Sequence, residues 1–219
     1  MPALTPFEKY GKTPRLYRDV HITEKLDGTN AQVTIIPTEQ LRQQYPASPL
    51  PETPTAVACD EELIIFAGSR NRVITPGKGT DNYGFAQFVL DNAEALAVSL
   101  GVGRHYGEWY GNGIARGYDL DEKRFALFHP RWQQEAHQES LPDRVEPVPL
   151  IMQRNMGEVD FDEVISELVA HGSHASPGFM SPEGVIVRHS ASKAIYKLLV
   201  ENATNPDHIK DPSPEELHQ

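Results

Sequence analysis

Short runs of alternating apolar and polar residues predict that much of this chain folds into strands. The runs are rich in β-branched and aromatic residues and are bounded by glycine, proline or charged residues, as is typical of strands. They cover residues 21–23, 31–36, 62–67, 104–110, 125–128, 184–187 and 194–199. The turn signal Asp27-Gly28 separates the first two runs, so we predict that they form a hairpin.

Helical periodicity is clearest in residues 82–100. Apolar residues recur there three or four positions apart, Asp81 can cap the start and Gly101 can end the helix. A second helix is predicted for residues 161–171, with Asp160 as its cap and Gly172 as its stop. We also expect a helical turn within residues 39–44.

Segments with few large apolar residues lie between these elements. Residues 37–60 and 130–149 are rich in proline and glutamine and predict long excursions from the fold. The polar lead, residues 7–20, is expected to pack across an edge of a sheet. Residues 203–219 are acidic and proline-rich, so we predict one folded domain over residues 1–202 and a flexible tail after it.

Composition indicates a cytoplasmic protein without membrane contact. The chain has 219 residues, and no apolar run approaches the length of a membrane span. The amino terminus lacks the charged and apolar regions of a signal peptide. A single cysteine, Cys59, excludes an internal disulfide, and no His or Cys pair has the spacing of a zinc site.

The segment from Lys25 to Asn30 carries the strongest candidate chemistry. If the segment is extended, Lys25 and Asp27 face the same side, and Gly28 gives the backbone the freedom to turn. A lysine beside a carboxylate at a glycine turn can serve as a nucleophile. Taken alone, the same residues also fit an ordinary hairpin turn.

Five further segments follow in order, most with one ionic residue at the edge of an apolar run. They are Ser69-Arg70, the segment around Glu108, the segment ending in Phe128-His129, Glu183-Gly184-Val185, and the segment around Lys197. This order resembles that of the covalent nucleotidyltransferases, which are the ATP-dependent DNA and RNA ligases and the GTP-dependent capping enzymes. The Lys-x-Asp-Gly-x-Asn form of the first segment is most similar to the ATP-dependent RNA ligases of the RNA ligase 2 group. The resemblance spans residues 23–199.

The resemblance implies an α+β, ATP-grasp-like adenylation domain of mainly antiparallel sheets flanked by helices. It also implies that Lys25 attacks ATP in the presence of Mg²⁺ (or Mn²⁺) and becomes covalently bound to AMP. The family pattern gives catalytic roles to Lys25, Asp27, Glu183 and Lys197, metal-side positions to Asp27 and Glu183, and nucleotide contacts to Glu24, Asn30, Arg70, Glu108 and Phe128.

Physical properties of several residues agree with these roles. Buried carboxylates such as Glu108 and Glu183 are costly unless they are paired or bind a cation, and hard divalent cations favour oxygen ligands. The guanidinium fork of Arg70 suits phosphate oxygens. By strand alternation Phe128 faces away from its apolar neighbours, which predicts stacking on a purine; a position in the core is the alternative.

Attack by Lys25 requires the neutral amine, although lysine is protonated at neutral pH in water. Nearby cations favour the neutral form, and Mg²⁺, Arg70 and Lys197 are the candidates. Asp27 and Glu24 act in the opposite direction, so the metal is needed for this chemistry.

The chain departs from the family pattern in the last segment. Lys197 stands alone, because Ile195 occupies the position of a second lysine. Arg188 or Lys193 is the expected substitute from the side. His129 also stands where the family usually has an aspartate.

The formal net charge of −11 disfavours broad contact with phosphates. We therefore expect RNA to be held by a narrow basic groove around Lys12, Arg15, Arg72 and Lys78, or by a partner protein, since related ligases usually carry a further carboxy-terminal domain. The favoured function is the joining of RNA ends that bear a 5′-phosphate and a 3′-hydroxyl. Two alternatives are transfer of AMP or GMP to another acceptor, and a nucleotide- or RNA-binding module with little turnover.

Overall fold

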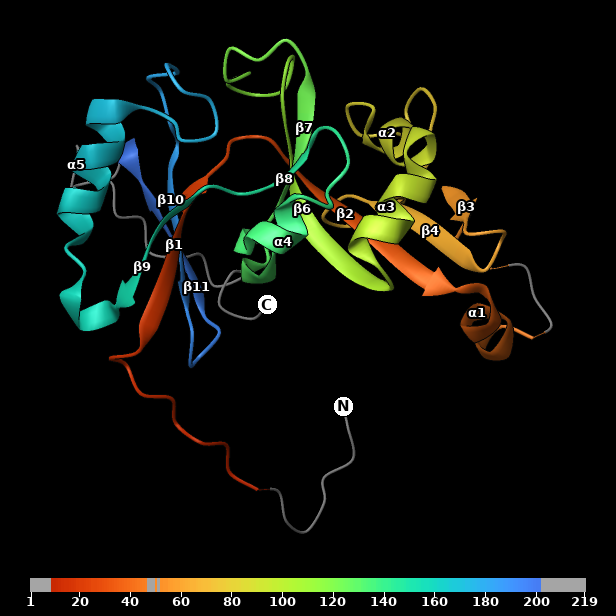
Figure 1. Ribbon diagram of the computed structural model, residues 1–219, viewed down its shortest axis with the longest axis horizontal. Helices are drawn as coiled ribbons and strands as arrows, with labels where there is room; N and C mark the ends of the chain where they lie inside the picture. Colours follow the sequence, from red (N-terminus) through yellow and green to blue (C-terminus); the bar gives the residue numbers. More distant parts are fainter. Residues whose placement is uncertain (1–8, 47–49, 51, 202–219) are drawn as a thin grey trace.

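Two sheets and a few short helices make up the fold in the computed structural model, which describes residues 9–46, 50 and 52–201 (Figure 1). Nearly all strand pairs are antiparallel, which confirms the predicted mixed α+β class. The predicted tail, residues 203–219, lies outside the described residues. Within the part described, no helix is both long and apolar enough to cross a membrane.

The smaller sheet has four strands in the order β11-β10-β1-β9. These are β1 (Asp19–Lys25), β9 (Leu150–Asn155), β10 (Gly184–His189) and β11 (Ile195–Leu199). Helix α5 (Phe161–His171) covers one face, on the side away from the larger sheet (Figure 1). Alternation along β1 and β10 directs valine and isoleucine side chains into the cluster with α5, and leaves the opposite face open.

The larger sheet has seven strands in the order β3-β4-β2-β6-β7-β8, with β5 paired to β4. Its strands are β2 (Thr29–Pro37), β3 (Ala56–Ala58), β4 (Leu63–Gly68), β5 (Val73–Ile74), β6 (Gly103–Gly111), β7 (Lys123–Leu127) and β8 (Val145–Pro147). Helices α2 (Phe85–Asp91) and α3 (Ala93–Leu100) cover one face and form the main core with it. On the opposite face, Asn30 of β2 and Glu108 of β6 are only partly buried, whereas Tyr110 and Ala126 are buried against Leu26.

The single helix predicted over residues 82–100 is wrong, because α2 and α3 are separated at Asn92. The Asn92 side chain donates to the Phe88 carbonyl oxygen at 2.8 Å, so it competes with the backbone for a helical acceptor. The predicted end is correct, but the first helix begins at Phe85 rather than Asn82, with Gly84 at the N-cap position. The Asp81 carboxylate accepts from the backbone N–H groups at the start of α2, and Gly101 follows the last residue of α3.

The hairpin predicted across Asp27-Gly28 is also wrong, because β1 and β2 belong to different sheets. Gly28 is needed for a different reason than the predicted turn. A Cβ atom at this position would lie 2.5 Å from the Trp109 carbonyl oxygen and 2.8 Å from the Tyr110 Cβ. The crossing from one sheet to the other therefore requires a residue without a side chain.

The two proline-rich segments contain more structure than predicted. The expected turn in residues 39–44 is α1 (Thr38–Gln44), and strand β3 follows it. Residues 130–149 form η1 (Pro130–Gln133), α4 (Glu135–Gln138) and β8. A short turn, η2 (Met156–Glu158), precedes α5. Residues 9–18 of the lead are exposed (Figure 1). The end of the lead contacts the smaller sheet as expected, because the Leu16 carbonyl oxygen lies 2.7 Å from the His189 Nε2 and the Arg18 carbonyl oxygen accepts from the Met156 backbone N–H at 3.0 Å.

Replacing Gly28 tests the close crossing between the sheets. Gly28→Ala should lower the free energy of unfolding by about 1–3 kcal/mol, because the added methyl group meets backbone that cannot easily move. Urea unfolding measures the change. Gly11→Ala is the matched control, since nothing lies within 4 Å of its added Cβ. Equal stability of the two variants would contradict this account of the crossing.

Candidate active site

A pocket of about 290 Å³ lies between the open faces of the two sheets. We call it the central pocket. The smaller sheet contributes side chains from β1 and β10, including Lys25, Ile186 and Arg188. The larger sheet contributes Asn30 and Glu108, which are register partners on β2 and β6.

Phe128 also lines the central pocket, immediately after the end of β7. Its side chain is 40% exposed, so it does not belong to the core. Arg70 lines the pocket from the segment after β4, as the order of motifs led us to expect.

A polar pocket of about 380 Å³ adjoins the central pocket and shares Asn30, Arg70 and Glu108 with it. Arg72 lines this second pocket, whereas Lys12 and Arg15 lie in the exposed lead. Of the four residues predicted to form a basic groove, only Arg72 lines one of these two pockets.

Lys25 and Glu183 are brought together by strand pairing. Lys25 is the register partner of Gly184, so the residue before Gly184 lies beside the lysine. The Lys25 Nζ is 2.5 Å from the Glu183 Oε2, and these side chains are 24% and 18% exposed. The candidate nucleophile is therefore ion-paired to a candidate metal-side carboxylate at the wall of the pocket.

Glu24 is 1% exposed and lies at the edge of the central pocket. Its Oε2 accepts hydrogen bonds from the backbone N–H groups of His174 and Ala175, at 2.8 and 3.0 Å. Its Oε1 is buried without a hydrogen-bond partner among the described residues. An unpaired buried acceptor is costly, and it suits a donor group supplied by a ligand.

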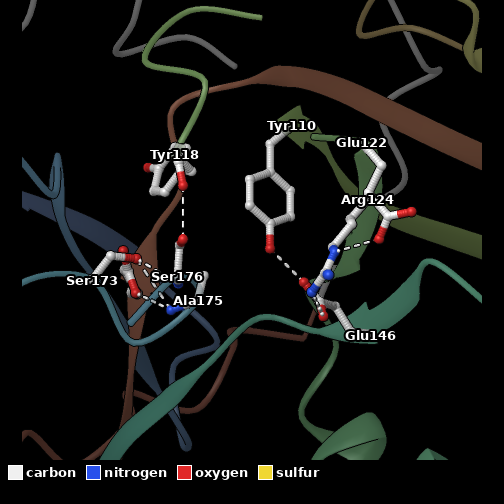
Figure 2. Close-up of polar contacts among 9 residues, drawn as sticks. Tyr110, Tyr118, Glu122, Arg124, Glu146, Ser173, Ala175 and Ser176 are labelled. Carbon is white, nitrogen blue, oxygen red and sulfur yellow. Dashed lines mark hydrogen bonds and ion pairs between the residues drawn. The ribbon is translucent and has the colours of Figure 1, made fainter. Parts of the chain in front are cut away.

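The loop that holds Glu24 was not predicted from the sequence. Figure 2 shows how it is fixed: the Ser173 hydroxyl accepts from the Ala175 backbone, and the Ser176 hydroxyl donates to the Tyr118 carbonyl oxygen at 2.7 Å. The run of small polar residues after Gly172, a stretch typical of tight turns, is the only local signal for it.

Figure 2 also shows a polar network of Tyr110, Arg124 and Glu146 beside this loop. The hydroxyl of Tyr110 donates to the Glu146 carboxylate, which also pairs with Arg124 at 3.4 Å. Burial raises the pKa of Tyr110, and the negative charge of Glu146 raises it further. Tyr110 therefore stays a neutral donor, and it packs edge-on against Tyr118.

Asp27 is not directed toward the central pocket. Its Oδ2 is 2.9 Å from the Arg116 Nε, and its backbone N–H donates to the Tyr118 hydroxyl. Arg116 also donates to the carbonyl oxygen of Ser181, just ahead of Glu183. Sequence reasoning missed Arg116, which ties the first motif to the segment that carries Glu183, the candidate metal-side carboxylate.

Lys197 lies on the exposed edge strand β11 and is not among the residues that line the central pocket. Ile195 lines the pocket from the same strand, and Arg188 lines it from β10. Of the two expected substitutes for the missing lysine, Arg188 is therefore at the pocket. Lys193 is exposed in the turn before β11.

Burial raises the pKa of Glu108 from 4.5 to about 7. The positive charges of Lys25 and Arg70 and a hydrogen bond with the Gly28 backbone oppose this rise, while the negative charge of Glu183 adds to it. Glu108 is therefore protonated in part of the molecules near neutral pH, and either protonation state can hydrogen-bond to a ribose hydroxyl.

Within the described residues, no group of three or more His, Cys, Asp or Glu side chains is placed to hold a metal ion. Magnesium in nucleotide sites is commonly held by one or two carboxylates together with substrate phosphates. Glu183 fits that pattern, because it lies beside Lys25 and close to the polar pocket. Asp27 fits it less well, because its carboxylate is paired with Arg116.

Glu108→Gln should change how stability depends on pH. The folded-state pKa of about 7 lies above the ordinary 4.5, so between these values the folded protein binds a proton that the unfolded chain has lost. Wild-type stability should fall relative to the variant as pH rises from 4.5 to 7, by a total of about 3 kcal/mol. Urea unfolding across this range measures the difference. The exposed Glu163→Gln serves as control, and a parallel pair of wild-type and Glu108→Gln curves would contradict the raised pKa.

Comparisons with known proteins agree with this geometry. The RNA ligase family model matches residues 18–199. The fold is similar to Naegleria gruberi RNA ligase, in a mutant with AMP and Mn (17% identity, TM-score 0.55, 88% of this chain and 52% of that chain). A mutant with ATP and Mn (16%, 0.55, 89% and 53%) and the enzyme with PPi (15%, 0.54, 94% and 59%) are also similar. No curated protein matches.

The chain spans about half the length of these solved structures, and identities this low show a shared fold. The family model, in contrast, covers most of the chain and includes every motif described above. This protein belongs to the RNA ligase family.

Proposed function

We propose that the chain is the adenylation domain of an ATP-dependent RNA ligase that acts through a covalent lysyl-AMP intermediate. The observation that carries the proposal is the Lys25 amine at the wall of a pocket, 2.5 Å from the Glu183 carboxylate. Under this proposal the ATP-grasp-like domain extends over residues 1–202. The proposed substrates are RNA ends bearing a 5′-phosphate and a 3′-hydroxyl.

The proposed base site lies between Phe128 and Ile186, with Glu24 at its edge. An aromatic ring and an aliphatic side chain suit the two faces of a purine. The free Oε1 of Glu24 accepts one hydrogen bond, which matches the exocyclic amino group of adenine. Guanine carries a carbonyl oxygen at that position, which the carboxylate would repel. This contrast favours ATP over GTP.

In the first step the Lys25 Nζ attacks the α-phosphorus. A nitrogen–phosphorus bond forms, the bond to the β-phosphate oxygen breaks, and pyrophosphate leaves while the amine loses its proton. Arg70 is the proposed phosphate contact, with Lys197 and Arg188 as further cations on the side of the smaller sheet. Glu183 and the phosphates would hold a divalent cation, which supplies Lewis-acid stabilisation of the developing charge.

In the second step an oxygen of the RNA 5′-phosphate attacks the AMP phosphorus, and Lys25 leaves and regains its proton. In the third step the 3′-hydroxyl attacks the activated 5′-phosphorus, loses its proton and releases AMP. Glu108 is proposed to hold the ribose throughout, because its carboxyl group lies in both the central and the polar pocket. A partner protein or a further domain can add grip on RNA.

Intact-mass analysis tests the covalent step. Incubation with ATP and Mg²⁺ should add one AMP to the wild type, GTP should add little, and Lys25→Ala should abolish the adduct. Lys123→Ala is the matched control, since this lysine lies on β7 and does not line the central pocket. An adduct that persists in Lys25→Ala would overturn the assignment of the nucleophile.

Truncating Phe128 tests the base site. Phe128→Ala should weaken ATP binding by about 1–3 kcal/mol, the scale of base–aromatic stacking. Phe128→Leu should weaken it less. Because the side chain is 40% exposed, the melting temperature should change little. Calorimetric titration with ATP measures the affinity. Unaltered affinity in a folded Phe128→Ala variant would remove Phe128 from the base site.

A further inference from the structure

A third pocket, of about 370 Å³, opens on the other side of Phe128. We call it the arginine–aromatic groove. It shares Asn30, Phe128, Arg188 and Ile195 with the central pocket, so the two are continuous. The groove otherwise draws on residues at the start of β6 and on η1. The residues from β6 and η1 have no role in the nucleotide chemistry proposed above.

The groove is positively charged in a chain with a net charge of −11. Three arginines line it, and none of its lining residues is acidic. Within the described part of the chain, the side chains of Arg104 and Arg188 have no hydrogen bond or ion pair. Unpaired arginines on a mostly acidic protein provide local complementarity to an anion.

Arg131 adds to this charge, whereas His129 favours its neutral form. The Arg131 guanidinium is held in place, because it stacks over Trp132 at 4.2 Å and donates to the Leu100 carbonyl oxygen. Burial lowers the pKa of His129, and the positive charges of Arg188 and Arg131 lower it further. The groove thus holds positive charge that no side chain around it neutralises.

Two aromatic rings are exposed in the same groove. The Phe128 backbone N–H donates to the Tyr106 carbonyl oxygen at 2.9 Å, so these residues are neighbours across β6 and the end of β7. Tyr106 and Phe128 are 47% and 40% exposed, and both lie on the open face of the larger sheet. Exposed rings beside unpaired arginines match the two parts of a single-stranded nucleic acid, the bases and the phosphates.

We propose that the arginine–aromatic groove binds an unpaired segment of the RNA to be joined. Bases stack on Tyr106, and Arg104 contacts the phosphate backbone. The inference rests on the proposed ligase function and names the form of RNA that this function would accept. A duplex fits poorly, because its base faces are already stacked and its major groove is too narrow for side chains. The continuity with the central pocket leads such a strand toward Lys25.

The triphosphate of ATP is a less suitable occupant. Phosphates alone do not need the exposed Tyr106 ring, and the polar pocket with Arg70 and Arg72 already adjoins the central pocket through Asn30, Arg70 and Glu108. An acidic peptide would match the charge, but it would not explain why the groove is continuous with the proposed nucleotide site.

The test measures binding of a fluorescent single-stranded oligoribonucleotide to the full chain across a salt series, without ATP. Arg104→Ala should reduce the slope of log affinity against log salt by about 0.7, the value for one lost phosphate contact to a single strand. Arg104→Lys should keep the slope. Tyr106→Ala should lower affinity about tenfold at every salt concentration without changing the slope, and Tyr106→Trp should restore it.

Matched controls lie on the opposite face of the smaller sheet. Arg154 and Tyr196 are exposed there, paired in register with Val20 and Val187, whose side chains face α5. Arg154→Ala and Tyr196→Ala should bind RNA as the wild type does. A blunt duplex of the same sequence should compete weakly.

Adenylylation measured on the same preparations separates this inference from the proposed function. If the groove variants bind RNA normally and the wild type forms the AMP adduct, the groove's role in RNA binding is overturned and the ligase proposal stands. Loss of the adduct in Arg104→Ala and Tyr106→Ala with normal RNA binding would assign the groove to ATP and overturn the inference. A wild type without any adduct, whose RNA binding still depends on Arg104 and Tyr106, would support the groove while overturning the ligase proposal.

Discussion

The passage of the Gly28 backbone against Trp109 and Tyr110 is the constraint on which the rest of the structure depends. It is where the chain leaves one sheet and enters the other, so it fixes how closely their open faces approach. Lys25 ends the strand before this point, and Asn30 lies in the strand after it. A single close contact thereby sets Lys25, the proposed nucleophile, on one wall of the central pocket and Asn30 and Glu108 on the other.

Carboxylates in three different environments surround the cleft. Glu183 is neutralised by Lys25, Glu24 is held by backbone N–H groups, and Glu108 is buried enough that its pKa rises to about 7. An acidic chain can therefore hold a polyphosphate, because its carboxylates near the site are paired, hydrogen-bonded or partly protonated. Unpaired arginines at the edges of the same cleft supply the remaining attraction.

Sequence patterns predicted the elements of the fold better than their connections. Helix α5 could be predicted with both ends, because periodicity, cap and stop agree within a few residues of one another. The hairpin at Asp27-Gly28 was predicted wrongly, since a turn signal does not reveal that β1 and β2 join different sheets. The predicted single helix is divided at Asn92, whose side chain also donates to the Phe88 carbonyl oxygen. Motif order predicted that Glu24, Asn30, Arg70, Glu108 and Phe128 lie together, and all five line the central pocket. Arg116 could not be predicted, because its partner Asp27 lies far away in sequence and no local pattern links them.

The hydrogen bonds that hold Glu24 affect how the proposed base preference could change. Its two donors are backbone N–H groups, and any residue except proline provides one. The side chain at position 174 can therefore change without releasing the carboxylate, whereas Ala175 also packs against the cluster around Tyr110 and Tyr118. The path of the loop is not free, because it is fixed by the serine contacts with its own backbone and with Tyr118. If Glu24 reads the base as proposed, insertions and deletions in this loop would move its carboxylate and alter base preference.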